Sequence, residues 1–300
     1  MNVLIYGDNA TINSYISSLK EIDLINDISV VSKEENKVYD NISYYSTIQQ
    51  VKSNSNIDFI IICDRYSNVQ DDWPELSSIN TPIIWDSCFI SQSLHLKEIR
   101  SNLEPNNLLF IGVNELFNPQ VADIHRNIER RFIGELGVAN LKRYTQTSDD
   151  HDLELQSELV ALYPYLSIVK RVFAMERKVD SKHYSTTTLR LENDAIINLE
   201  IFIGAQEYLR NGEYAGTRGV IKYSSESHTM KLKTASKQKS FTPTKLNDKK
   251  QMIAHFLQNI NNQEMNNTWS IHERALQIKD AIKQSLETGA PVYIGGENYE

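Results

Sequence analysis

Gly7 is the first residue whose type and position indicate a chemical role. It ends the apolar run of residues 2–6, and a helical pattern follows directly. Glycine at such a turn lets a pyrophosphate approach backbone N–H groups and the positive end of the helix. Of the three glycines in the dinucleotide fingerprint only this one is present, since Asn9 and Ile12 hold the other positions. Asn9 tolerates a left-handed backbone, whereas Ile12 adds bulk. A purely structural turn is the alternative.

Two further places could contact a dinucleotide. Ser32-Lys33 follows the second predicted strand, where an acidic residue usually binds the adenosine ribose. Taken alone, this pair could favour a 2′-phosphate and hence NADP, but a surface lysine is the commoner explanation. Arg65 follows residues 57–63 and could hold a phosphate or carboxylate, or pair with a neighbouring aspartate. The predicted cofactor-binding residues are Gly7, Asp8, Asn9, Ala10, Thr11, Ser32, Lys33, Cys63, Asp64 and Arg65.

The elements that must position these residues alternate between strands and helices. Residues 57–63 form a continuous apolar run, which is typical of a central strand buried on both faces. Residues 12–19 carry the i, i+3, i+4, i+7 apolar pattern of a helix. Repeated strand–helix–strand units predict an α/β fold with a Rossmann-like, doubly wound parallel sheet. We expect residues 1–115 to form this dinucleotide-binding domain.

Residues 116–300 have a different pattern of apolar residues. Apolar residues alternate with period two over 186–203 and again over 219–233, which predicts two antiparallel hairpins. Residues 235–250 are polar and rich in lysine, and we expect a solvated loop there. A closing helix is predicted over 271–288. The second domain is therefore expected to be α+β, with a largely antiparallel sheet, and to serve substrate binding and oligomerisation.

Composition narrows the classes of function. The 300 residues carry 31 Lys and Arg against 39 Asp and Glu, a net charge of -8 that disfavours nucleic-acid binding. No apolar run approaches the roughly 20 residues that span a bilayer, so we expect no membrane partner. Two cysteines cannot form a disulfide framework, and seven scattered histidines show no metal-ligand spacing. We expect a cytoplasmic protein without a metal site.

Four short motifs lie in the second half of the sequence, and their order is informative. They read IGEL, GTRG, HFL and SLETGAPV, and the last closes the predicted helix. In this order they resemble motifs of the Gfo/Idh/MocA (glucose–fructose oxidoreductase / inositol dehydrogenase) family. The resemblance implies two domains, an NAD or NADP cofactor and a small-molecule substrate. It also implies a homodimer, because relatives usually pair through the C-terminal sheet.

The positions that carry the family's chemistry depart from its pattern. Asp86, Ser87 and Cys88 stand where the family has Glu-Lys-Pro, so its proton-transfer lysine is missing. The family's Asp-x-x-x-His pair would fall in a helix near residues 159–173, which contain neither type. Tyr165 is the natural proton donor there, although core packing is the alternative role. The predicted catalytic residues are Tyr165, Asp86 and Lys170.

These departures define the expected function. The chain is identified as a divergent member with degenerate cofactor and catalytic motifs. We expect an NAD(P)-dependent oxidoreductase acting on a small molecule, with C=N or C=C reduction favoured over oxidation of a sugar alcohol. The alternative is a catalytically inactive member that serves as a ligand-binding, regulatory or partner subunit.

Overall fold

The chain folds into two units in the computed structural model, which describes residues 1–7, 9–32, 42–54, 56–103, 108–146, 151–227, 229–243, 247–260 and 266–295. The first unit comprises Met1–Phe117 and Asn247–Glu273, and the second comprises Asn118–Leu246 and Arg274–Glu300. The first segment ends close to the boundary expected after residue 115. Each unit is thus assembled from two separate stretches of sequence.

The first unit is built on a six-stranded parallel sheet with the order β3-β2-β1-β4-β5-β6. This confirms the predicted Rossmann-like fold, in which the strand order reverses between β1 and β4. All five residues of β4 are fully buried, as its unbroken apolar sequence requires. The strands are β1 (Asn2–Gly7), β2 (Asp27–Val31), β3 (Ile42–Tyr45), β4 (Phe59–Cys63), β5 (Ile83–Asp86) and β6 (Leu109–Gly112).

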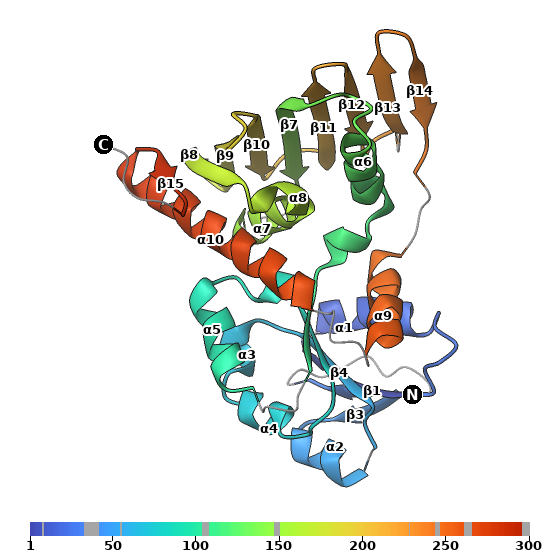
Figure 1. Ribbon diagram of the computed structural model, residues 1–300. Coiled ribbons are helices and arrows are strands. Elements are labelled where there is room, and N and C mark those ends of the chain that lie inside the picture. Colours follow the sequence, from blue (N-terminus) through green and yellow to red (C-terminus); the bar gives the residue numbers. More distant parts are fainter. Residues whose placement is uncertain are drawn as a thin grey trace. The chain divides into compact units, whose positions relative to one another are not determined.

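Helices cover both faces of this sheet (Figure 1). On one face Tyr15 of α1 and Met252 and Phe256 of α9 join a single hydrophobic core with Phe59 and Phe110 of the sheet. Two chain segments far apart in sequence therefore complete one core. The helices of this unit are α1 (Asn9–Leu19), α2 (Ile48–Asn54), α3 (Tyr66–Val69), α4 (Trp73–Ser77), η1 (Ser87–Phe89), α5 (Ser93–Ser101), η2 (Asn114–Phe117) and α9 (Asp248–Asn259).

The segment expected to be a solvated loop over 235–250 contains regular structure. Its polar strand β14 (Gln238–Phe241) pairs with β13 at the edge of the second sheet, where exposed side chains need not be apolar. Helix α9 begins at Asp248, and the Asn247 side chain caps it by accepting from the Lys250 backbone N–H at 3.1 Å. The expectation of a loop was wrong at both places, because a cap and an edge strand are short polar patterns.

The second unit contains a nine-stranded sheet with the order β14-β13-β12-β11-β7-β10-β9-β8-β15. Only the β7–β10 pair is parallel, so the predicted, largely antiparallel sheet is confirmed. Both predicted hairpins, β9–β10 and β12–β13, are present. The strands are β7 (Leu136–Thr145), β8 (Val169–Val179), β9 (Lys182–Leu191), β10 (Ile196–Ile203), β11 (Leu209–Gly216), β12 (Gly219–Ser224), β13 (Thr229–Thr234), β14 and β15 (Val292–Tyr293).

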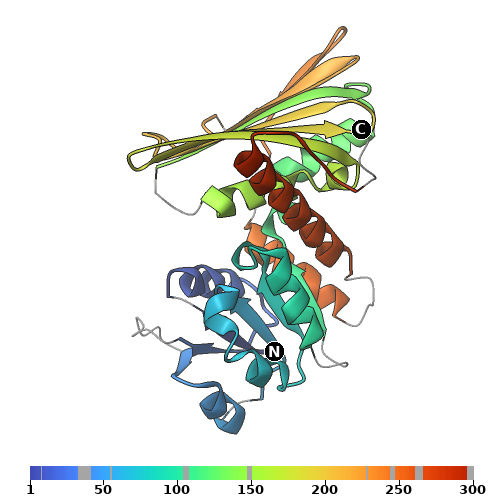
Figure 2. The ribbon, with the colours of Figure 1, turned by 90° about the vertical axis from the view of Figure 1, so that its left-hand side faces the viewer.

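Helices cover one face of this sheet and leave the other face open (Figures 1 and 2). Strand β10 shows the consequence, because Leu199 and Ile201 are buried whereas Glu200 and Phe202 remain partly exposed. The helices are α6 (Pro119–Glu129), α7 (His151–Ala161), α8 (Tyr163–Leu166) and α10 (Asn266–Thr288), whose first residues are assigned to the first unit. The closing helix therefore begins before the predicted residue 271, and it ends as expected, ahead of Gly289 at φ +65°.

The IGEL and GTRG motifs of the sequence meet in the second unit. The Thr217 backbone N–H donates to the Glu135 carbonyl at 2.9 Å. A Cβ added to Gly216 would lie 2.3 Å from the Ile133 carbonyl oxygen and 2.7 Å from that of Glu135. Glycine is required at position 216 because two backbones approach each other closely there.

Gly216→Ala is expected to destabilise the protein by about 1–3 kcal/mol, because the new methyl group meets backbone that cannot yield. Gly137→Ala is the matched control on the neighbouring strand, since its Cβ would meet its nearest atom at 3.7 Å. Urea unfolding measures both. Equal unfolding midpoints for the two variants would contradict this account of the motif.

Candidate functional site

The carboxyl ends of β1 and β4 form the point where the strand order reverses, which is where ligands of such sheets bind. Gly7 and Cys63 are register partners at these ends. A Cβ on Gly7 would lie 2.6 Å from both the Cys63 carbonyl oxygen and its Sγ atom. The sequence therefore keeps a glycine here because the two strand ends touch.

Ile12 does not crowd the start of α1. Its side chain is only 1% exposed and belongs to the hydrophobic core with Val3 and Ile5. Its bulk thus fills the space beneath the helix instead of the space in front of its N-terminus. The described residues of this turn fit a pyrophosphate held by backbone N–H groups.

Six of the other predicted cofactor residues lie in or next to α1 or follow β2. Asn9, Ala10 and Thr11 form the first turn of α1. Ser32 follows β2 and is buried, at the strand end where an adenosine ribose would bind. The predicted contacts Asp8 and Lys33 lie outside the described residues.

The residues after β4 serve local structure as well as any ligand. Cys63 is fully buried, and its thiol donates to the Tyr6 carbonyl at 3.5 Å. The Asp64 carboxylate accepts from the Arg65 backbone N–H at 2.7 Å and from the Asn68 amide at 2.8 Å, next to the start of α3. Arg65 is exposed at the same edge of the sheet. The structure thus brings Gly7, Cys63, Asp64 and Arg65 together.

Asp86 lies at the end of β5 and is 1% exposed. Its carboxylate accepts from the Tyr15 hydroxyl at 2.6 Å, from the Cys88 backbone N–H at 3.2 Å and from the Asn114 amide at 3.4 Å. Burial, then the charge of Asp86, raises the pKa of Tyr15 well above its usual value, so this phenol stays protonated. Three donors around a buried carboxylate favour a role in holding the strand end.

Tyr165, the predicted proton donor, lies on α8 with Tyr163. Both rings contact His125 of α6 edge-on, with centroid distances of 5.7 Å for Tyr165 and 5.0 Å for Tyr163. Burial, together with the charge of Glu129, raises the pKa of Tyr165. Lys170 lies apart from this group as an exposed residue of β8, because the predicted helix over 159–173 gives way to a strand at Val169.

His125 is a buried polar residue that the sequence reasoning missed. Its Nε2 atom donates to the Ala161 carbonyl at 2.7 Å. This hydrogen bond connects α6 to the junction between α7 and α8. Its Nδ1 atom has no hydrogen-bond partner in the described part of the chain. Burial lowers the pKa of His125 from 6.5 to about 4. The ring is therefore neutral at physiological pH and offers an unused lone pair.

A buried ionic cluster lies between α7 and the sheet of the second unit. Glu158 Oε1 accepts from Arg143 Nη1 at 2.9 Å and from Arg210 Nε at 2.8 Å, and Arg143 also pairs with Glu154. Burial alone would raise the pKa of Glu158, but the two guanidinium groups hold it below its usual value. The charges of the two arginines and two glutamates balance, so the cluster offers no net charge to a ligand.

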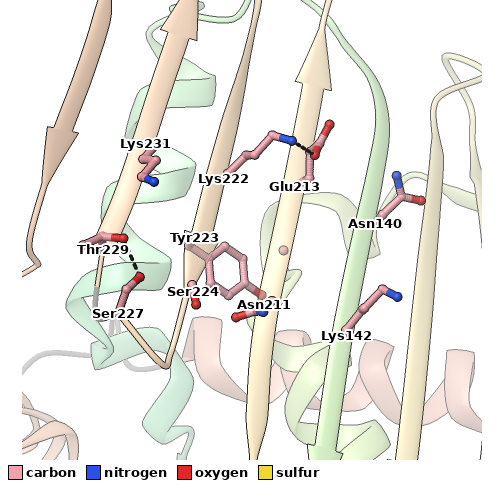
Figure 3. A pocket seen from close by; sticks show the side chains of 11 residues that line it. Asn140, Lys142, Asn211, Glu213, Lys222, Tyr223, Ser224, Ser227, Thr229 and Lys231 are labelled. Carbon is pink, nitrogen blue, oxygen red and sulfur yellow. Dashed lines mark hydrogen bonds and ion pairs between the residues drawn. The ribbon is translucent and has the colours of Figure 1, made fainter.

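A hollow of about 470 Å³ lies on the open face of the same sheet (Figure 3). Strands β7, β11, β12 and β13 form it, and Lys142, Lys222 and Lys231 project into it. Lys222 pairs with Glu213 at 2.5 Å, and Lys142 pairs with Glu200 at 3.1 Å. Two of its three lysines are thus paired with carboxylates.

The described residues contain no group of three or more His, Cys, Asp and Glu side chains that could hold a metal ion. No helix in the described ranges is long and apolar enough to cross a membrane.

Comparison with known proteins shows the class of fold. No family model matches the chain, and no curated protein matches its sequence. An oxidoreductase from Agrobacterium radiobacter, in complex with NAD+, L-tartaric acid and magnesium, has a TM-score of 0.80 at 12% identity over 98% of each chain. Biliverdin reductase from Synechocystis, in complex with biliverdin and NADP+, has a TM-score of 0.76 at 13% identity, covering 95% of this chain and 99% of that chain.

A myo-inositol dehydrogenase from Corynebacterium glutamicum has a TM-score of 0.76 at 15% identity over 99% of each chain. Such identities establish shared fold and nothing finer. The chain therefore has the two-domain fold of these oxidoreductases, and the resemblance to the Gfo/Idh/MocA family is confirmed at that level.

Acidification is expected to destabilise the protein through His125. The unfolded chain binds a proton near pH 6.5 and the folded chain only near pH 4, so the stabilisation is complete above pH 6.5 and is lost as the pH falls to 4. The shift corresponds to about 3 kcal/mol. Burial lowers the pKa of His151 to about 4 as well. His125→Gln, which retains an N–H donor, should therefore remove only part of the pH dependence of the unfolding free energy.

Chemical denaturation between pH 4 and 7 measures this slope, with His151→Gln as the comparison variant. An unchanged slope in His125→Gln would show that His125 titrates normally in the folded protein.

Proposed function

We propose that this protein is an NAD(P)-dependent oxidoreductase acting on a small molecule. The observation that carries the proposal is the turn at Gly7, which sits where the strand order reverses and leaves Ile12 in the core. Such a turn offers backbone donors to a dinucleotide. The NAD+ and NADP+ complexes of the fold neighbours support the same cofactor class.

The predicted contacts follow from the places of these residues. Gly7 and the first turn of α1, with Asp8 before it, would hold the pyrophosphate, and Ser32 with Lys33 would hold the adenosine ribose. Cys63, Asp64 and Arg65 line the edge beside the reacting half. When bound, the cofactor supplies a hydride. The chain's own residues must bind and orient the substrate and provide a proton.

We propose reduction of a C=N or C=C bond, in which one atom of the double bond gains the hydride and the other gains a proton. Ser87 stands where related enzymes carry the lysine used in alcohol oxidation, and its side chain is buried. Tyr165 is the proposed proton donor, since its raised pKa keeps the phenol protonated. Asp86 and Lys170 have weaker support, because one is enclosed by its donors and the other is exposed on β8.

A binding function without catalysis is the second candidate. Two observations favour it: three donors already occupy the Asp86 carboxylate, and Ser87 stands where related enzymes carry their proton-transfer lysine. The same fold would then present a ligand-binding, regulatory or partner subunit. Loss of reduction with retained nucleotide binding would distinguish this candidate from the enzyme.

We also propose that the protein is a cytoplasmic homodimer formed through the open face of the nine-stranded sheet. Tyr184 and Phe202 stack there at 4.1 Å, and Tyr144 meets Phe202 edge-on at 5.6 Å. Tyr184 is 39% exposed and Met175 is 58% exposed, an unusual amount of apolar surface for a free sheet face. The free thiols of Cys63 and Cys88 agree with a reducing compartment.

Titration with NADH and with NADPH, followed by fluorescence, tests the proposed activity. We expect at least one to bind below about 1 mM. With a panel of cyclic imines and conjugated enones as acceptors, Tyr165→Phe should lower cofactor oxidation about 100-fold without weakening cofactor binding. Tyr163→Phe is the matched control on the same helix. Failure of both nucleotides to bind would exclude the oxidoreductase.

Light scattering tests the dimer, for which we expect twice the chain mass of 34.5 kDa. Tyr184→Glu should shift the equilibrium toward the monomer, since it buries a charge in the proposed interface. Glu135→Lys, on the IGEL turn, serves as a surface control. A monomeric wild-type protein at micromolar concentration would refute the dimer.

A further inference from the structure

Lys249 reaches the candidate site from a part of the chain remote in sequence. It is the second residue of α9, which packs against α1 in the first unit. Its ammonium nitrogen lies 3.0 Å from Ser14 Oγ and 4.5 Å from the centroid of the Tyr15 ring. The side chain is partly buried by these contacts. A lysine from the segment predicted to be a solvated loop thus contacts α1, the helix that follows the Gly7 turn.

The contacts of Tyr15 connect this ammonium to the end of β5. The Tyr15 ring lies beneath Lys249, and its hydroxyl donates to the Asp86 carboxylate at 2.6 Å. The charge of Lys249 also opposes the rise in the pKa of Cys88 that burial and Asp86 cause. Since Cys88 lies two residues beyond the end of β5, the ammonium is within electrostatic reach of that strand end.

The hydrogen bonding of Lys249 is incomplete. An ammonium group has three N–H donors, and the described residues provide one acceptor, Ser14, and one aromatic face. Its neighbour Lys250 differs, because it pairs with the Glu21 carboxylate at 3.3 Å. A partly buried cation with a neutral partner retains the capacity to bind an anion or a polarised oxygen.

The order of the strands decides which end of a bound dinucleotide faces this group. In a dinucleotide bound at this switch point, the adenosine ribose would lie over the end of β2, on one side of the point where the order reverses. The reacting half must then lie toward β4 and β5. Lys249 is on that second side, with Tyr15, Asp86 and Cys88.

We infer that Lys249 is the cationic substrate contact of this site, and that it binds a carboxylate or carbonyl oxygen next to the double bond that is reduced. The inference rests on the proposed function and narrows its substrate class to molecules that carry such an oxygen. Without substrate, the ammonium is held by Ser14 and the Tyr15 ring. A bound substrate oxygen would accept from the N–H donors of Lys249 that Ser14 does not use.

The test follows Lys249 directly, so that it does not depend on turnover. Lysines are reductively methylated with a ¹³C label, and Lys249→Arg assigns the Lys249 resonance. The protein saturated with NADH or NADPH is then titrated with acetate, pyruvate and L-tartrate up to about 50 mM, a range that detects weak binding. We expect at least one carboxylate to move the Lys249 signal saturably and to leave the Lys250 signal unchanged.

Lys249→Met should weaken binding of that carboxylate about 10-fold, measured by calorimetry, while cofactor affinity changes less than about threefold. Lys250→Met should change neither quantity, and unfolding midpoints check that both variants fold. A Lys249 signal unmoved by all three carboxylates would overturn the inference, as would a larger loss of cofactor affinity in Lys249→Met. Wild-type protein that binds neither nucleotide would instead refute the proposed function, and this inference with it.

Discussion

The hydrogen bond between Tyr15 and Asp86 is the interaction on which the candidate site depends. It joins α1 to the end of β5 across β4, and both partners are removed from water. A buried carboxylate is tolerated only when its oxygens are satisfied, and the Cys88 N–H and Asn114 amide supply further donors. The ends of the strands that would face a ligand are thereby held in one arrangement.

The second constraint is that the parallel sheet needs both faces covered. Residues 1–117 do not complete the core by themselves, because Met252, Ile253 and Phe256 of α9 fill the space over Phe59 and Phe110. Helix α9 therefore packs on the first unit because its apolar side chains complete that unit's core. Its docking also sets Lys249 beside α1, so a packing requirement brings a charged group to the candidate site.

The second unit differs from the first because its broad, largely antiparallel sheet has helices on one face only and leaves the other face open. Beneath the helices, Arg143, Arg210 and Glu158 satisfy one another in the interior. His125 anchors the helix junction that carries Tyr163 and Tyr165. On the open face, Tyr184, Phe202 and Tyr144 form an aromatic row, and a polar hollow lies over β7, β11, β12 and β13 (Figure 3).

The sequence by itself determined the class of fold and many of its elements, but not the strand and helix start within residues 235–250 or the strand that begins at Val169. The apolar run of β4 and the period-two alternation of β10 depend on local burial patterns, which a sequence displays directly. It also located the Gly7 turn. It placed Ser87 at the position where the Gfo/Idh/MocA pattern has a lysine. Tertiary structure alone decided that Ile12 points into the core, that Asp86 is enclosed and that Lys249 lies over Tyr15. The contacts of Asp86 with Tyr15 and of Lys249 with Ser14 join residues 71 and 235 positions apart, and no pattern along the chain specifies which distant side chains will meet.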